Sequence, residues 1–469
     1  MLLTEFTLTE VSRALGILAV LVLAAASFRR YIPGIRRLYL PNSVVAGFVG
    51  LALGPQLLGA LFDESRMSDG LFGLTTIDVW AALPGLLINV VFASILLGKK
   101  LPPLNAIWRS SAPQVMFGAM LSFGQYMWGL ALALLILVPV FGMSPLTGGL
   151  LEISFTGGHG TAAGLSQTMI DLGFPEGPDL ALGLATVGLV AGIVVGTLLI
   201  NRAVSSEKIT IARQEKVEKG PETDLGRIDL HDVPEELEPD PATSPLTMTV
   251  GAISLAIGLG WLFQELLVSI EVLTTSAARE NSLIGQIPLF PFTIIGGAAL
   301  QVVLSARGWA HQVPRKYVNQ ASGVALDLLI AAAIATLSLS TIGANAIPFA
   351  LMATVAVVWS VVAFVYLAPK FYGTRWFERG MGDFGQSSGT VASGFLLINM
   401  SDPVGISGAS EPYGYKQLLF EPILGGGLIT ALSLPLIYRL GAGWSLVGAT
   451  FATLVCLIIG VRLKKSEQA

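Results

Sequence analysis

The sequence predicts an all-α integral membrane protein built as an inverted repeat of two five-helix halves. Of its 469 residues, 53% are hydrophobic and 12% are charged, whereas a soluble domain averages about 25% charged residues. Apolar runs recur that are long enough to cross a hydrocarbon core of roughly 30 Å. Each half is also interrupted, at a matching place, by a polar segment rich in glycine. Together these features indicate a polytopic membrane protein in which each half carries one polar interruption within its apolar helices.

Eleven apolar runs are predicted to be membrane-spanning helices. They are 11–28, 41–60, 77–97, 112–141, 179–202, 246–269, 288–306, 322–341, 345–368, 417–438 and 442–462. Two tracts, 142–178 and 379–402, contain too much Gly, Ser and Thr to cross as simple helices. Irregular backbone at membrane depth is tolerated only inside protein or beside water. We therefore expect each tract to be a re-entrant hairpin that returns to the side from which it entered.

The basic residues predict the orientation. With the N-terminus outside, all but four of the 27 Lys and Arg lie in predicted cytoplasmic segments, the exceptions being Arg13, Arg66, Arg279 and Arg439. Cytoplasmic loops are enriched in Lys and Arg. Lys416 is assigned to one of these loops. This bias favours both hairpins, because a tract that crossed the membrane completely would move the basic residues after it to the other side. It also favours a cytoplasmic C-terminus.

Four segments make up the predicted domain organisation. Residues 1–203 form the first repeat with hairpin 142–178, and 246–440 form the second with hairpin 379–402. Because five is an odd number of spans, the second repeat enters the membrane in the opposite orientation to the first. Between them, 204–245 is acidic and rich in proline, as expected for a cytoplasmic linker without fixed structure. The remainder, 441–469, is an additional C-terminal helix and tail.

Several functions are disfavoured by what the sequence lacks. It has one cysteine, Cys456, so no internal disulfide can form. There is no Walker motif for ATP, no HExxH motif and no basic patch for nucleic acid. We expect no catalytic residues and no cofactor other than a coupling ion.

The first break, Thr156–Gly164, is predicted to contribute to a binding site. Its substrate-binding candidates are Thr156, Gly157, Gly158, His159, Gly160 and Thr161. Glycines let the backbone approach a ligand, and the ends of broken helices offer N–H groups to anions and carbonyls to cations. The alternative is that His159 and its glycines serve close helix packing.

The second break offers hydroxyl and amide groups at the corresponding place in the other half. The substrate-binding candidates here are Gln386, Ser387, Ser388, Gly389 and Thr390. The alternative is that its hydroxyls bond back to helical carbonyls. Asp383 begins the break, which runs to Gly394, and is expected near the cytoplasmic mouth, where the alternative to a role in the site is solvation by water.

Four residues are sodium-ligand candidates. Asp327 lies in the middle of a predicted span, where a charge costs roughly 2.5–3.5 kcal/mol, so it should meet a cation, a proton or a polar cavity. The others are Glu152, Asn89 and Ser393. No arginine is predicted in the middle of a span. An anionic substrate would therefore need helix ends, hydroxyls and co-bound cations to balance its charge.

These segments resemble the bacterial glutamate–sodium symporter family. The resemblance rests on SFTGGHGTAAG (154–164), LATVGLVAGIVVG (184–196), LPNSVVAGFVGLALG (40–54), and, more weakly, GQSSGTVASGFLLINM (385–400) and PILGGG (422–427). By position, Gly157, Gly158, His159, Gly160 and Thr161 match the first-hairpin motif of the family. The second break is less rich in glycine than the family pattern, and Asp327, Glu152 and Glu421 stand where neutral residues are expected.

The resemblance implies sodium-coupled uptake of glutamate, or of a related amino acid or carboxylate, across the bacterial inner membrane. It also implies a homodimer embedded in lipid, in which a domain holding the hairpins moves as an elevator against a scaffold. One alternative is a cation/proton antiporter that uses Asp327 and Glu152. Another is an intramembrane enzyme in which His159 would activate Ser154, a pairing that the spacing of these two residues supports weakly.

Overall fold

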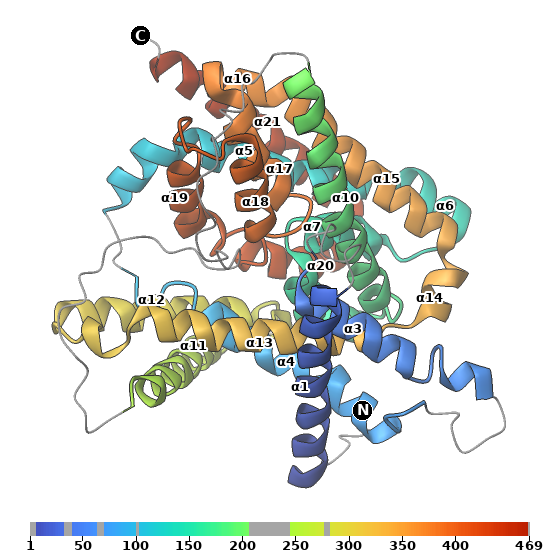
Figure 1. Cartoon of the computed structure of the whole chain (residues 1–469). Helices are drawn as coiled ribbons and strands as arrows, with labels where there is room; N and C mark the ends of the chain where they lie inside the picture. Colours follow the sequence, from blue (N-terminus) through green and yellow to red (C-terminus); the bar gives the residue numbers. More distant parts are fainter. Residues whose placement is uncertain are drawn as a thin grey trace. The chain divides into compact units, whose positions relative to one another are not determined.

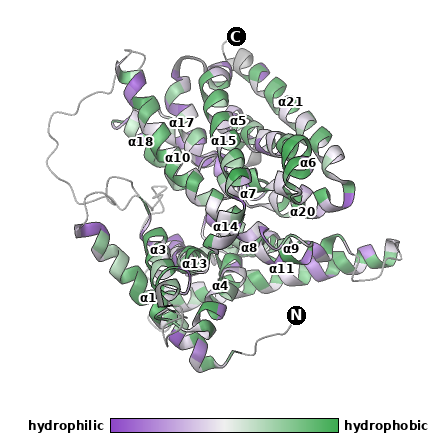
Figure 2. Cartoon of the chain, turned by 90° about the vertical axis from the view of Figure 1, so that its right-hand side faces the viewer, coloured by the Kyte–Doolittle hydropathy of each residue, from purple (hydrophilic) through white to green (hydrophobic). Residues whose placement is uncertain are grey.

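The computed structural model describes residues 6–31, 40–62, 70–99, 103–205, 244–275 and 282–467, and all regular structure within them is helical. Eight helices in these ranges are long and apolar enough to cross a membrane, and four shorter helices of 10–17 residues are also apolar. Colouring by hydropathy shows the helices apolar along most of their length (Figure 2). The predicted all-α membrane class is confirmed. Most of the predicted linker 204–245 lies outside the described residues.

The helices group into two compact units, each assembled from distant parts of the chain (Figure 1). Unit 1 comprises 1–98, 159–183 and 242–346, and unit 2 comprises 99–158, 184–241 and 347–469. Each unit therefore draws helices from both predicted repeats.

Unit 1 is built mainly from six helices that pack in two similar groups. Its main helices are α1 (Leu8–Tyr31), α3 (Asn42–Leu53), α4 (Leu74–Ala93), α11 (Pro245–Thr275), α12 (Phe290–Ala306) and α13 (Arg315–Ala335), with the short α8 (Gly158–Gly164), α9 (Ser166–Asp171) and α14 (Leu339–Ala344). Short 3₁₀ turns lie at Gly59–Phe62, Ile284–Gln286 and Ala310–Gln312. α3 packs on α1 and α13, and α12 packs on α11 and α4. α1 also contacts α4 and α13, as α11 contacts α13 and α4.

Small residues bring the backbones of unit 1 close together. A Cβ on Gly47 would lie 2.5 Å from Cβ of Ile334, and one on Gly50 would lie 2.8 Å from Cβ of Ala335. Gly47 and Gly50 therefore set the contact between α3 and α13, the small-residue packing typical of membrane helices. The indole N–H of Trp80 is buried and donates to the Ala14 carbonyl at 2.9 Å.

Unit 2 contains the remaining helices. They are α5 (Leu104–Leu132), α6 (Val138–Phe141), α7 (Leu150–Phe155), α10 (Gly177–Ser205, whose first turns belong to unit 1), α15 (Ala346–Val362), α16 (Ala368–Tyr372), α17 (Trp376–Gln386), α18 (Val391–Ser401), α19 (Ser410–Phe420), α20 (Leu428–Leu440) and α21 (Ala442–Glu467). 3₁₀ turns lie at Pro145–Gly149 and Gly373–Arg375. α5 contacts α7, α16, α17, α19 and α21, and an aromatic cluster that includes Phe117, Phe364, Phe371 and Phe384 fills the core of the unit.

Two long helices of unit 2 share one irregularity. The helix begun by α5 passes through a π-helical segment, Ala133–Leu137, before α6, and the helix begun by α15 passes through another, Ala363–Leu367, before α16. In each case proline is the second residue of the continuing helix, Pro139 or Pro369. Proline has no N–H and its ring displaces the carbonyl four residues earlier, so a π-bulge absorbs the distortion. The irregularity thus recurs at matching places in the two predicted repeats.

Three predicted spans are not single helices. α3 covers only Asn42–Leu53 of the run 41–60, and α13 ends at Ala335 within the run 322–341. The run 417–438 is not one helix, because α19 ends at Phe420 and α20 begins at Leu428. Between them Gly425 and Gly426 adopt φ of 66° and 102°, a left-handed backbone region that glycine enters without a steric penalty. Hydropathy averaging concealed this turn because its remaining residues are largely apolar.

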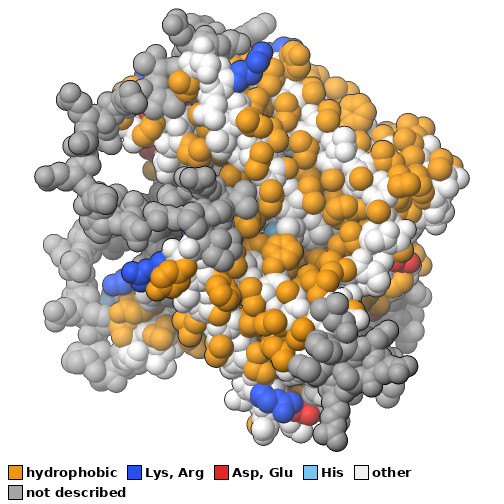
Figure 3. All heavy atoms as spheres, turned by 45° about the vertical axis from the view of Figure 1, so that its right-hand side comes forward, with side chains coloured by type: hydrophobic (Ala, Val, Ile, Leu, Met, Phe, Trp, Pro, Cys, Tyr) orange, Lys and Arg blue, Asp and Glu red, His pale blue; other side chains and the backbone are white. Residues whose placement is uncertain are grey.

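Large apolar side chains cover much of the exposed surface. Leu135, Leu273 and Trp444 are 75%, 82% and 74% exposed. Hydrophobic atoms dominate the face in Figure 3, with few charged side chains among them. Exposed apolar side chains in this number mark contact with lipid or another apolar partner.

Candidate functional site

The first predicted break is a real interruption of helical structure. α7 ends at Phe155, and the N–H groups of Thr156 and Gly157 both bond to the Glu152 carbonyl, at 3.0 and 2.9 Å. Gly158 follows with φ of 71°, which is costly for any residue with a Cβ. The chain then resumes as α8.

The second break lies at the tip of a helical hairpin formed by α17 and α18, which pack side by side (Figure 1). A Cβ on Gly385 would lie 2.7 Å from Cα of Gly394, so the arms approach at backbone distance. Thr390 caps α18 by accepting the Ser393 N–H at 3.2 Å, as N-terminal hydroxyls commonly do. The tip therefore presents the carboxyl end of α17 beside the amino end of α18.

Gln125 of α5 joins the two breaks within unit 2. Its Nε2 donates to the Ser387 carbonyl at 2.6 Å, and its Oε1 accepts from the Thr156 hydroxyl at 2.6 Å. A Cβ on Gly158 would lie 3.0 Å from the Gly389 carbonyl oxygen. Thr156–Gly158 and Ser387–Gly389, which are far apart in sequence, therefore meet at van der Waals and hydrogen-bonding distance.

Glycines of α10 complete this arrangement. A Cβ on Gly188 would lie 2.8 Å from the Ser388 carbonyl oxygen, and one on Gly192 would lie 2.8 Å from Cβ of Ser388. The tip of the α17–α18 hairpin thus rests on bare backbone of α10. Sequence inspection assigned these two glycines no role in the site.

Other predicted substrate residues fall in unit 1. His159 and Thr161 begin the unit 1 part of the first tract, and both are buried. A Cβ on Gly160 would lie 3.5 Å from Cδ1 of Ile88 and 3.6 Å from Cδ1 of Leu326. The residues of the first break are therefore divided between the units after Gly158.

The four sodium candidates are also divided between the units. In unit 1, Asp327 is exposed on α13, and the Asn89 amide donates to the carbonyls of Gly85 and Leu86 in its own helix. In unit 2, Ser393 belongs to the hairpin tip described above. Among the described residues, no group of three or more His, Cys, Asp and Glu side chains could hold a metal ion. Within the described residues, a sodium site would therefore combine at most two such side chains with backbone, hydroxyl or amide oxygens.

Glu152 is fully buried in unit 2 and ties three elements together. Its Oε2 accepts from the Tyr126 hydroxyl at 2.6 Å, and its Oε1 accepts from the Thr430 hydroxyl at 3.0 Å and the Gly425 N–H at 3.3 Å. Three donors suit an ionised carboxylate. The contact with Gly425 holds the turn between α19 and α20 against α7.

The alternative that water solvates Asp383 is wrong, and so is the assignment of Lys416 to a loop. Both side chains are almost completely buried and form an ion pair, with Nζ 2.6 Å from Oδ1. Nζ also donates to Gln386 Oε1 at 2.7 Å. Sequence reasoning missed the pair because its members are 33 residues apart. The signal available in the sequence was Lys416 itself, a charged residue in a short segment after the broken tract 379–402.

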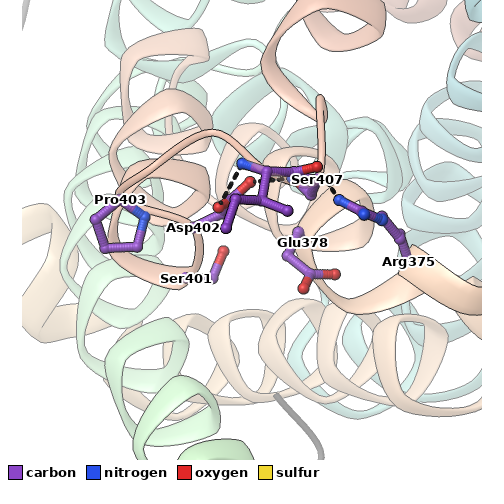
Figure 4. A pocket seen from close by; sticks show the side chains of 7 residues that line it. Arg375, Glu378, Ser401, Asp402, Pro403 and Ser407 are labelled. Atoms are coloured by element: carbon purple, nitrogen blue, oxygen red, sulfur yellow. Dashed lines mark hydrogen bonds between the residues drawn. The ribbon is translucent and has the colours of Figure 1, made fainter. Parts of the chain in front are cut away.

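A cavity of about 140 Å³ lies at the base of the hairpin, away from its tip. Residues from the start of α17 and the end of α18 line it together with the following loop: Arg375, Glu378, Ser401, Asp402, Pro403, Ile406 and Ser407 (Figure 4). Asp402 accepts from the N–H groups of Ile406 and Ser407 at 3.0 and 2.6 Å, and Arg375 donates to the Ile406 carbonyl. Arg375 and Asp402 thus anchor the loop to the hairpin.

Comparison with known proteins places the chain in a family. Residues 7–376 match the family model described as the sodium/glutamate symporter. The matched region includes the first break and ends at the start of α17. No individual curated protein matches the sequence. Because the match covers well over half of the chain, the protein belongs to the sodium/glutamate symporter family.

Proposed function

We propose that this protein imports glutamate, or a related amino acid or carboxylate, by coupling its movement to sodium entry. Family membership supports sodium coupling. The observation that carries the proposed site is the Gln125 bridge, which brings the breaks of the two repeats together through Thr156 and Ser387. In a transporter with broken helices, such paired breaks form the substrate and ion sites.

The hairpin tip supplies groups for both solutes. The amino end of α18, around Thr390 and Ser393, suits a substrate carboxylate because helix N-termini present N–H groups and a positive dipole end. The carboxyl end of α17, at Ser387–Gly389, suits sodium because its carbonyls carry the negative dipole end. Ser393, Glu152, Asn89 and Asp327 remain proposed contributors to cation binding, each testable by itself.

The packing within unit 1 supports an inverted repeat. Exchanging α1 with α11, α3 with α12, and α4 with α13 reproduces the same set of helix contacts. In unit 2, the π-bulges before Pro139 and Pro369 lie at matching places in the two repeats, as the same symmetry would require. We infer that the two halves share one arrangement of helices, inserted in opposite orientations. We also infer that alternating access uses an elevator-like motion in a homodimer of the bacterial inner membrane.

The alternative functions receive less support from the structure. An intramembrane hydrolase would need a nucleophile bonded to a base, but the buried Ser154 hydroxyl has no hydrogen-bond partner among the described atoms. The alternative of a cation/proton antiporter that uses Asp327 and Glu152 is tested separately, by looking for a sodium-driven pH change in the absence of any amino acid.

Uptake of radiolabelled glutamate into proteoliposomes tests the proposed function. Sodium entry supplies about 2.3 kcal/mol per charge per 100 mV and about 1.4 kcal/mol per tenfold gradient. We expect concentrative uptake with inward sodium and none when potassium replaces it. Equal uptake in both salts would refute sodium coupling. Competition by unlabelled aspartate, glutamine and dicarboxylates identifies the substrate.

Alternating access can be followed at the hairpin tip. Cys456 is the one cysteine of the chain, so C456S provides a cysteine-free background for T390C. We expect a membrane-impermeant thiol reagent to label T390C from either side of the membrane, with a sidedness that changes when sodium and glutamate are added. Labelling from one side under all conditions would contradict the proposed motion.

A further inference from the structure

The buried Lys416 ammonium of unit 2 lies in a pocket of cation-binding groups. Its Nζ is 2.6 Å from Asp383 Oδ1 and 2.7 Å from Gln386 Oε1, and 4.1 Å from the centre of the Phe420 ring. A carboxylate oxygen, an amide oxygen and an aromatic face each attract a monovalent cation. Glu421 adds a weaker electrostatic attraction.

The oxygens of this pocket are oriented by groups other than Lys416. Asp383 Oδ2 accepts from the Tyr372 hydroxyl at 2.6 Å and also from the Gln114 amide. Gln386 Nε2 donates to Gln417 Oε1 at 2.8 Å, which turns Gln386 Oε1 toward the ammonium. If the lysine side chain were removed, these contacts would still direct two oxygens toward the vacated space.

This pocket adjoins the proposed transport site. Gln386 directly precedes Ser387, whose carbonyl accepts the bond from Gln125. A Cβ on Gly118 of α5 would lie 2.4 Å from Nζ of Lys416, so α5 passes the ammonium at backbone distance. The ammonium thus bonds to Gln386, a residue of the second break, which we propose to hold substrate and sodium.

We propose that Lys416 is a tethered cation, covalently supplied by α19 in the place where a free monovalent cation would otherwise bind. Its charge neutralises Asp383 in the second break, so the site needs one fewer free cation to accept an anionic substrate. This role in transport rests on the proposed function, whereas the cation-binding character of the pocket can be tested without it.

Replacing Lys416 by alanine tests the proposal, because K416A leaves Asp383 and Gln386 facing an empty space. The probe is methylammonium chloride, compared with choline chloride, at constant sodium. Thermal unfolding of the purified full chain in detergent is the measurement. We expect methylammonium to raise the unfolding midpoint of K416A and to leave the wild-type midpoint unchanged. D383N/K416M, which removes both charges and fills the space, should show no response to methylammonium.

Two results would overturn the proposal. One is equal unfolding of K416A in methylammonium and choline. The other is failure of K416A to fold in either salt, because a free cation then cannot replace the tethered one. In proteoliposomes, methylammonium should restore part of the uptake that K416A loses. If the wild type transports no glutamate at all, the proposed function fails while the unfolding comparison still decides the nature of the pocket.

Discussion

Replacing Gly158 by alanine tests whether contact between the two breaks is required for transport. Gly158 has φ of 71°, and its added Cβ would lie 3.0 Å from the Gly389 carbonyl oxygen. Gly142 provides a matched control, because its φ is 66° and nothing lies within 4 Å of its added Cβ. Both substitutions incur about 1–2 kcal/mol for placing alanine in the left-handed region. Only G158A also crowds the contact between the two breaks.

The extra cost at Gly158 is that of crowding a packed interior, about 1–3 kcal/mol. An energy of this size changes an equilibrium constant by about 5–150-fold. We therefore expect G158A to reduce glutamate uptake by about that factor beyond the loss in G142A. Uptake per folded protein in proteoliposomes is the measurement, with thermal unfolding of both variants as the stability control. Equal uptake by the two variants would refute the reasoning, because the Gly158–Gly389 contact would then be unimportant.

Three further predictions concern other residues of the proposed site. Q125L should lower stability by about 1–3 kcal/mol, because it leaves the Ser387 carbonyl without its Gln125 donor, and it should also abolish uptake. The control Q301L removes a partly buried bond from the Gly98 N–H in unit 1, and it should lower stability while uptake per folded protein persists. D327N should raise the sodium concentration for half-maximal uptake, and an unchanged sodium curve would make Asp327 structural. H159A should weaken glutamate uptake without unfolding the protein, and wild-type kinetics in that variant would remove His159 from the site.

The location of most helices followed from local properties. Long apolar segments such as Gly177–Ser205 and Pro245–Thr275 satisfy their own backbone hydrogen bonds, so hydropathy alone identifies them. The interruptions at Thr156–Gly158 and Ser387–Thr390 were also visible, because their glycines and hydroxylated residues are poor candidates for a continuous apolar helix. The turn between α19 and α20 was not visible, since apolar residues flank its glycines.

The sequence by itself determined that this is a helical membrane protein of the symporter family with a polar break in each half. Only the tertiary structure decided which distant groups satisfy one another. Gln125 could join Thr156 to Ser387, and Lys416 could neutralise Asp383, only after helices from separate parts of the chain had packed. The physical reason is that burial makes an unpaired polar group costly, but burial and pairing both arise from packing, which no local sequence pattern specifies.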